Sequence, residues 1–299
     1  MRRFVFGMCA VALVTAGIAG AQTTFERETA AARAQSAAAA KSPNGWLTLI
    51  ALEWLKPGET TVGSAEDNRV KIAGVPPHVG VIVVDGVSSS LRPPAGGFPA
   101  EVAVDGRALV AGPLLSDATG RPTAVHCGTV TMTVIARGDR LYLRVKDSQA
   151  PTRVNFHGLN WYPPDVKYRL KAKWIPYSPP KFVSIPNVLG QTSSNASPGA
   201  IEFSIGGRTY RLDATGGDDK ELSFIFRDLT SKTTTYGAGR FLETGGPDHG
   251  LLVGGTVVVD FNRAYNPPCA YTPYATCPLP PEQNRLAVAI PAGEKRYHE

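Results

Sequence analysis

The clearest pattern in the chain is an alternation of hydrophobic and polar residues with a period of two. Residues 130–134 place Val, Met and Val between threonines, and residues 141–145 alternate Leu, Leu and Val with Tyr and Arg. The turn Arg-Gly-Asp-Arg at 137–140 separates the two runs. Because successive side chains of a strand point to opposite faces, this pattern predicts a β-hairpin with one buried and one wet face.

The same reasoning predicts strands along most of the chain. Residues 201–205 alternate in the same way and turn on Gly206-Gly207. Paired glycines supply the positive φ that a tight hairpin turn needs. The other expected strands are Val81–Val84 before the turn Asp85-Gly86, Val102–Val104 before the turn Asp105-Gly106, Leu222–Phe226, Leu251–Phe261 and Leu286–Ile290. Turn signals recur without long helices between them, so we expect a mainly β fold. The predicted architecture is an antiparallel sandwich or barrel of many short strands with few short helices.

The N-terminal part of the chain divides into three segments. Residues 1–21 combine a basic start, an apolar run and a small-residue cleavage site, which is the pattern of a secretory signal peptide. Residues 22–43 are rich in Ala and other good helix formers, which predicts a helical or partly ordered leader. Residues 44–299 are expected to form the β-rich domain, either as one unit or as two packed β subdomains.

The signal peptide predicts a location in the periplasm or outside a bacterial cell. No later stretch approaches the ~18 consecutive apolar residues of a membrane-spanning helix, so no membrane span is expected after cleavage.

Trp46 and Trp54 lie in a segment that is apolar throughout, so we expect them to be core anchors rather than surfaces that stack on a ligand.

Residues 178–191 carry several prolines, and we expect this segment to link two β halves of the chain.

Composition narrows the class of partner. The chain has 31 Lys and Arg against 25 Asp and Glu, a formal charge of +6, and loss of Arg2 and Arg3 with the signal peptide leaves about +4. No basic block is interleaved with aromatic residues, so a nucleic-acid partner is not expected. A small molecule is the expected partner, and the oligomeric state does not follow from the sequence.

Familiar catalytic and cofactor signatures are absent from the sequence. It contains no Gly-x-Ser-x-Gly elbow, no His-Glu-x-x-His helix, no phosphate-binding loop and no dinucleotide fingerprint. The histidines after residue 21 are His78, His126, His157, His249 and His298. No two of them have the spacing of metal ligands. We therefore expect neither a metal nor a cofactor.

The most distinctive residues lie in the C-terminal third. Asp-Phe-Asn-Arg at 260–263 leads to Tyr-Asn-Pro-Pro-Cys-Ala at 265–270, then to Ala-Thr-Cys-Pro at 275–278 and Asn-Arg-Leu at 284–286. Supporting matches lie at 54–58, 143–147 and 158–163. In these residues the chain resembles the domain of unknown function 1684 family of bacteria and archaea. The resemblance extends from about residue 46 to 295, and it implies no activity and no catalytic residue.

The same motif predicts a polar pocket beside residues 260–285, because loops on a rigid β scaffold commonly carry function. Asp260 and Asn262 would share one face of a strand, and Arg263 would lie on the opposite face unless the strand twists or bulges there. The candidate ligand-binding residues are Arg240, Asp260, Asn262, Arg263 and Asn266. The alternative is structural: these polar groups would pair with one another and satisfy local backbone donors.

Three cysteines follow the signal peptide. Cys269 and Cys277 are close in sequence, and an oxidising compartment favours a disulfide between them. Cys127 would then be a small buried apolar residue. The alternatives are buried free thiols or a reactive thiolate at Cys269 or Cys277.

The leading functional hypothesis is an exported protein that binds a small molecule without a cofactor. The first alternative is a hydrolase of an envelope metabolite, with Asp228 or Asp260 as general base and Arg240 or Arg263 stabilising negative charge. The second alternative is a structural or partner-binding envelope protein.

Overall fold

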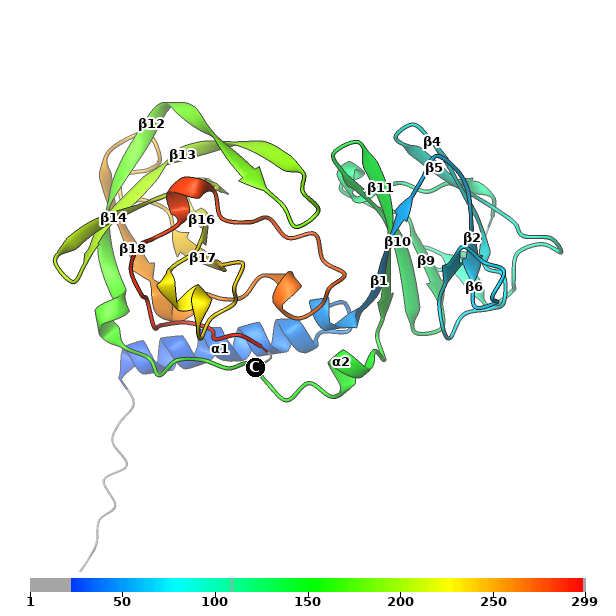
Figure 1. Cartoon of the computed structure of the whole chain (residues 1–299), viewed down its shortest axis with the longest axis horizontal. Coiled ribbons are helices and arrows are strands. Elements are labelled where there is room, and N and C mark those ends of the chain that lie inside the picture. Colours follow the sequence, from blue (N-terminus) through cyan, green and yellow to red (C-terminus); the bar gives the residue numbers. More distant parts are fainter. Residues whose placement is uncertain (1–22, 109, 298–299) are drawn as a thin grey trace, which may run out of the picture.

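A computed structural model describes residues 23–108 and 110–297, and the fold is mainly β (Figure 1). The predicted signal peptide, residues 1–21, lies outside the described residues. In the described part of the chain, no helix is both long and apolar enough to cross a membrane. The strands form two separate β units, each with its own core, and helix α1 lies along one of them.

Helix α1 (Thr24–Lys41) precedes the strands and begins with a capping box. The Thr23 hydroxyl accepts a hydrogen bond from the Glu26 N–H, and the Glu26 carboxylate accepts one from the Thr23 N–H. Its apolar positions are mostly Ala, so the helix can approach its neighbours closely. It runs beneath the C-terminal strands and leads to the start of β1 (Figure 1).

The N-terminal β unit, residues 46–147, consists of two sheets. Its six-stranded sheet has the order β1-β11-β10-β9-β6-β7, and its five-stranded sheet has the order β3-β2-β4-β5-β8. The strands are β1 (Leu49–Leu55), β2 (Gly58–Gly63), β3 (Val70–Lys71), β4 (Gly80–Asp85), β5 (Ser88–Arg92), β6 (Val102–Val104), β7 (Arg107–Ala108), β8 (Gly112–Pro113), β9 (Ala124–Cys127), β10 (Val130–Arg137) and β11 (Arg140–Asp147). The pairings are antiparallel except for β2 with β3. The hairpin predicted from the alternation is therefore confirmed as β10 and β11.

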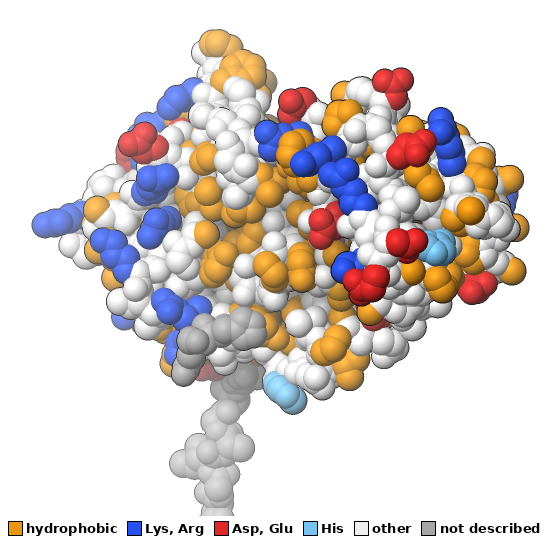
Figure 2. Space-filling view, turned by 45° about the vertical axis from the view of Figure 1, so that its right-hand side comes forward, with side chains coloured by type: hydrophobic (Ala, Val, Ile, Leu, Met, Phe, Trp, Pro, Cys, Tyr) orange, Lys and Arg blue, Asp and Glu red, His pale blue; other side chains and the backbone are white. Residues whose placement is uncertain are grey.

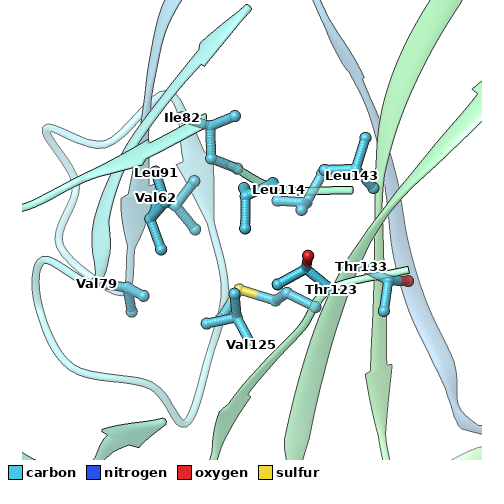
Figure 3. A pocket seen from close by; sticks show the side chains of 11 residues that line it. Val62, Val79, Ile82, Leu91, Leu114, Thr123, Val125, Thr133 and Leu143 are labelled. Carbon is cyan, nitrogen blue, oxygen red and sulfur yellow. The ribbon is translucent and has the colours of Figure 1, made fainter. Parts of the chain in front are cut away.

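Aliphatic side chains from both sheets fill the core of this unit. Val62, Ile82 and Leu91 of one sheet face Val125 and Leu143 of the other around a small cavity (Figure 3). The cavity volume is ≈ 10 Å³, room for about one water molecule. It is a gap in packing and offers no space for a ligand.

The chain passes between the two units along residues 148–168, through the short helix α2 (Pro151–Val154). The expectation that residues 178–191 form this linker is wrong. Most of them belong to the long hairpin of β12 (Arg169–Pro186) and β13 (Thr192–Ile205). The register shifts between Pro176 and Lys181, where prolines cannot donate to the ladder, so the prolines produce an irregularity instead of a linker.

The C-terminal β unit, residues 169–297, also has two sheets, of order β14-β13-β12-β18 and β15-β16-β17. Its remaining strands are β14 (Arg208–Asp213), β15 (Gly216–Gly217), β16 (Glu221–Phe226), β17 (Arg240–Gly245) and β18 (Gly255–Asp260). Its core combines aliphatic with aromatic side chains, and Phe261 packs against both Phe203 and Phe226 at ring-centroid distances of 5.3 and 5.5 Å. The predicted Gly206-Gly207 hairpin is confirmed as β13 and β14.

After β18 the chain is irregular, and the strand expected at Leu286–Ile290 does not form. Two asparagines hold this irregular chain in place of a ladder. Asn262 Oδ1 accepts from the Asp165 N–H and its Nδ2 donates to the Asp165 carbonyl, both at 2.9 Å. Asn284 makes the same pair of bonds with Asp213, both at 2.8 Å. Each side-chain amide therefore replaces the backbone of a neighbouring strand.

Trp46 and Trp54 are not core anchors, since they are 40% and 44% exposed. Arg140 lies 4.9 Å from the Trp54 ring centroid, and Arg144 lies 5.7 Å from that of Trp46. Both rings lie on the surface under cations of β11, which favour the electron-rich ring face.

The two units meet where β1 and β10 approach residues 269–277. Leu49 packs in one cluster with Ala275 and Cys277, and Arg137 Nε donates to Thr276 Oγ1 at 2.9 Å. On the face shown in Figure 2, hydrophobic side chains gather toward the middle, and most charged side chains lie around them.

Candidate functional site

A groove of ≈ 890 Å³ lies between α1 and the C-terminal β unit. Small residues of α1, among them Ala32, Ser36 and Ala39, form one side, and residues of β17 and β18 form the other. The irregular chain after β18 closes the remaining side with residues 263–271. The family motif noted above therefore lines a concave surface.

Glu294 is the most deeply buried acid of this groove, with no exposed surface. The Tyr271 hydroxyl donates to its Oε1 at 2.6 Å, and the Asn266 N–H donates to its Oε2 at 2.9 Å. Burial raises the pKa of Glu294 to about 6, although these two hydrogen bonds oppose the rise. The groove lining thus contains a carboxyl group whose pKa is higher than that of an ordinary glutamate.

A second tyrosine–glutamate pair lies on the β17 side of the groove. The Tyr265 hydroxyl donates to Glu243 Oε1 at 2.7 Å, and burial raises the pKa of Tyr265 above its usual value. Phe241 packs edge-on against the Tyr265 ring at 5.8 Å, and the two residues also pair through their backbones. Glu243 is exposed, so the two glutamates of the groove lie in different environments.

Asp260 and Arg263 are brought together by a turn. β18 ends at Asp260, and a single 3₁₀ turn over Phe261–Arg263 follows, with Asp260 Oδ1 accepting from the Asn262 N–H at 3.0 Å. Arg263 Nε consequently lies 3.7 Å from Asp260 Oδ2. The strand that would have placed Arg263 on the opposite face has already ended, so these residues share one edge of the groove.

The candidate residues separate into two groups. Asp260, Arg263 and Asn266 line the groove, whereas Arg240 and Asn262 are fully buried and do not. Asn262 connects the motif to residue 165, as described above.

Arg240 lies in the core with Asp228, and both side chains are fully buried. Arg240 Nη2 lies 3.3 Å from Asp228 Oδ1, and its guanidinium also donates to the carbonyls of Ile290 and Ala292. Asp228 accepts from the Ile290 N–H at 2.6 Å. This pair anchors the C-terminal segment, and neither residue lines the groove.

The sequence analysis missed several residues of the groove. Tyr265 precedes Asn266 in the motif and Tyr271 directly follows Ala270, so their position beside the candidate residues was a usable signal. Glu294 lies in the polar run near the C-terminus, which was a weaker sequence signal. No sequence signal marked Glu243 or the Ala-rich face of α1, because only the folded chain brings them to the motif.

The disulfide expected between Cys269 and Cys277 is not formed, and Cys127, Cys269 and Cys277 are all free thiols. The Cys269 N–H donates to Cys277 Sγ at 3.0 Å, and the Cys277 N–H donates to Cys269 Sγ at 3.3 Å. The loop is thus closed by hydrogen bonds to sulfur. The hydrogen bond with Cys277 lowers the pKa of Cys269, and the same contact raises that of Cys277.

Within residues 23–108 and 110–297, no group of three or more His, Cys, Asp or Glu side chains is placed to hold a metal ion.

Fold and groove define a mainly β protein with a polar concave site on its C-terminal unit. The sequence profile of a family described as a protein of unknown function (DUF1684) matches residues 154–295, and the chain belongs to this family. A solution NMR structure of the uncharacterized protein from gene locus rrnAC0354 of Haloarcula marismortui is similar, with 34% sequence identity over 49% of this chain and 80% of that chain, at a TM-score of 0.41. No curated protein matches the chain.

Proposed function

We propose that the protein is exported and binds a small polar molecule in the groove between α1 and the C-terminal β unit. The observation that carries this proposal is the convergence of Asp260, Arg263, Asn266 and Glu294 on one concave surface. Its volume of ≈ 890 Å³ falls within the roughly 300–1,000 Å³ typical of small-molecule sites. Collecting charged and polar groups there costs desolvation energy, which a binding role explains.

The export part of the proposal rests on the signal-peptide pattern of residues 1–21. It is tested by expressing the full chain in a bacterium and sequencing the N-terminus of the protein recovered from the periplasm. Cleavage before Gln22 is expected. An uncleaved chain that stays in the cytoplasm would contradict it.

Binding is tested by thermal shift against a broad panel of small molecules, followed by calorimetry of each compound that raises the melting temperature. Glu243→Gln and Tyr265→Phe change the groove wall at a partly exposed pair, so both variants should fold. We expect at least a several-fold loss of affinity in these variants. Glu59→Gln is the matched control, since Glu59 lies on β2 of the other unit. A compound whose affinity is unchanged in both groove variants binds elsewhere. If no compound of the panel loses affinity in these variants, the proposal is contradicted.

Glu294 favours a second candidate function, a hydrolase. Its buried carboxyl and the exposed carboxylate of Glu243 lie in one groove in contrasting environments, which is how enzymes separate an acid from a base. Asp260 stays available as a base and Arg263 as a cation, while burial removes Asp228 and Arg240 from contact with a substrate.

The hydrolase is tested with panels of ester, phosphoester and glycoside substrates. We expect turnover to be abolished in Glu294→Gln while circular dichroism of the variant is unchanged. Turnover that survives this substitution would show that Glu294 takes no part in the chemistry.

A further inference from the structure

Two almost fully buried side chains of the groove lining carry an unpaired oxygen. Asn266 is 2% exposed and Asp260 is 7% exposed. No described residue donates a hydrogen bond to Asn266 Oδ1 or to Asp260 Oδ2. Arg263 Nε is 3.7 Å from Asp260 Oδ2, which is too long for a hydrogen bond. Buried acceptors normally have donors, so both oxygens are suited to a donor supplied by a ligand.

The tyrosine hydroxyls and the Asn266 amide of the groove already donate within the protein. The hydroxyls of Tyr265 and Tyr271 donate to Glu243 and Glu294. Asn266 uses its N–H on Glu294 and its Nδ2 on the Lys295 carbonyl, the latter at 2.7 Å. The lining therefore offers two unpaired acceptors together with the cationic donors of Lys220 and Arg263, and a ligand whose groups both donate and accept matches it.

The charges of the lining nearly cancel. Its acidic residues are Glu221, Glu243, Asp260 and Glu294, and its basic residues are Arg169, Lys220 and Arg263. Arg169 is paired with Glu28 of α1 at 2.7 Å. Lys146 and Arg144 already lie over Trp46, at the end of the groove formed by that ring. Because the charges of the lining nearly cancel, it selects against a strongly charged ligand of either sign.

Aromatic side chains complete the lining. Trp46, Phe241, Tyr265 and Tyr271 all belong to it. Aromatic carbon beside unpaired acceptors fits a molecule that carries both C–H groups and hydroxyl groups.

We propose that the groove binds a neutral polyhydroxylated ligand, a short saccharide or a sugar alcohol. This inference rests on the proposed binding function and specifies the class of ligand. Hydroxyl groups of the ligand donate to Asp260 and Asn266, and an apolar ring face packs against the aromatic side chains.

The test uses the mature protein and three sets of probes at millimolar concentration: maltose, cellobiose, chitobiose and mannitol; spermidine and choline; citrate and inorganic phosphate. Saturation-transfer NMR detects binding and calorimetry measures it. At least one neutral probe should bind. Asp260→Asn should weaken its binding at least tenfold, because one carboxylate oxygen becomes an amide donor. Glu243→Gln should weaken it several-fold, and Glu59→Gln should leave it unchanged.

The contrary outcomes separate the two proposals. Binding of an amine or an anion that is lost in the groove variants, without any neutral probe binding, overturns the saccharide inference and leaves the binding function standing. Saccharide binding that is unchanged in both groove variants overturns the inference as well. Asp260 begins a 3₁₀ turn, so if Asp260→Asn does not fold, Glu243→Gln decides the result. If no probe of any set binds, the inference about the ligand class is wrong. The proposed binding function is then tested by the broad thermal-shift panel alone.

Discussion

The N-terminal and C-terminal β units bury different kinds of side chain. The first has an aliphatic core around a cavity of ≈ 10 Å³. The second adds aromatic side chains to an aliphatic core and also buries Asp228, Arg240 and Glu294, each at most 3% exposed. Alternation of hydrophobic residues is enough to hold two sheets together, as the first unit shows. The second unit additionally uses polar anchors to hold irregular chain, and the groove lies where that chain runs.

The family profile matches the C-terminal β unit and not the N-terminal one. Residues 154–295 comprise nearly all of the C-terminal β unit and its polar anchors. If the C-terminal unit depends on buried charge and the N-terminal unit does not, loss of a buried charge should destabilise the first far more than loss of an exposed charge destabilises the second.

The largest expected effect is that of Arg240→Met. It leaves the Asp228 carboxylate buried without its cation, so the free energy of unfolding should fall by about 3–5 kcal/mol. Arg92→Met is the control in the N-terminal unit, where the Arg92–Glu59 pair is 60% and 63% exposed and should contribute at most about 1 kcal/mol. Urea unfolding followed by fluorescence measures both. Equal losses in the two variants would remove the contrast between the units.

Glu294 should make stability depend on pH. Its pKa is raised from 4.5 to about 6 on folding, so between these values the folded protein holds a proton that the unfolded chain releases. The free energy of unfolding therefore falls as pH rises through this window, by about 2 kcal/mol in all. Glu294→Gln stays neutral and should lack this fall. Denaturant unfolding below pH 4.5 and above pH 6 measures the difference, and parallel curves for the two proteins would contradict the assignment.

The cysteines offer a smaller contrast between the units. Cys127 lies in the aliphatic core, where burial raises its pKa, whereas Cys269 is half-buried and its contact with Cys277 lowers its pKa. We expect Cys269 to be alkylated by iodoacetamide at least about tenfold faster than Cys127 in the folded protein. Peptide mapping by mass spectrometry gives both rates, and urea should make them similar. Faster alkylation of Cys127, or a bridged Cys269–Cys277 peptide from periplasmic protein, would contradict the free-thiol arrangement.

Periodicity predicted the parts of the fold that depend on alternation. Both hairpins were found because one face of each strand is buried and short turns join the strands. The prediction of a strand at Leu286–Ile290 was wrong because this segment is held by polar side chains that lie far away in the sequence. Asp228 and Arg240 bind the backbone of Ile290 and so replace the ladder that the apolar run alone suggested.

The candidate site was predicted only where its residues are close together in the sequence. Asp260, Arg263 and Asn266 are local to one motif, so their grouping was visible in the sequence. Glu243 and the Ala face of α1 reach the groove only through tertiary packing. Arg240 looked like a ligand-binding residue because a sequence does not distinguish an arginine that binds a ligand from one that binds a buried carboxylate.

The two asparagine anchors have a consequence for how related proteins can diverge. Asn262 and Asn284 fix the chain at both ends of residues 263–283 through their side-chain amides. A strand in a ladder keeps its backbone hydrogen bonds whichever side chains it carries, whereas each of these paired bonds is lost when its asparagine is replaced. The attachment of this chain to the rest of the unit therefore depends on the identity of two side chains. We expect members of the family to keep both asparagines even where the groove they border takes a different ligand.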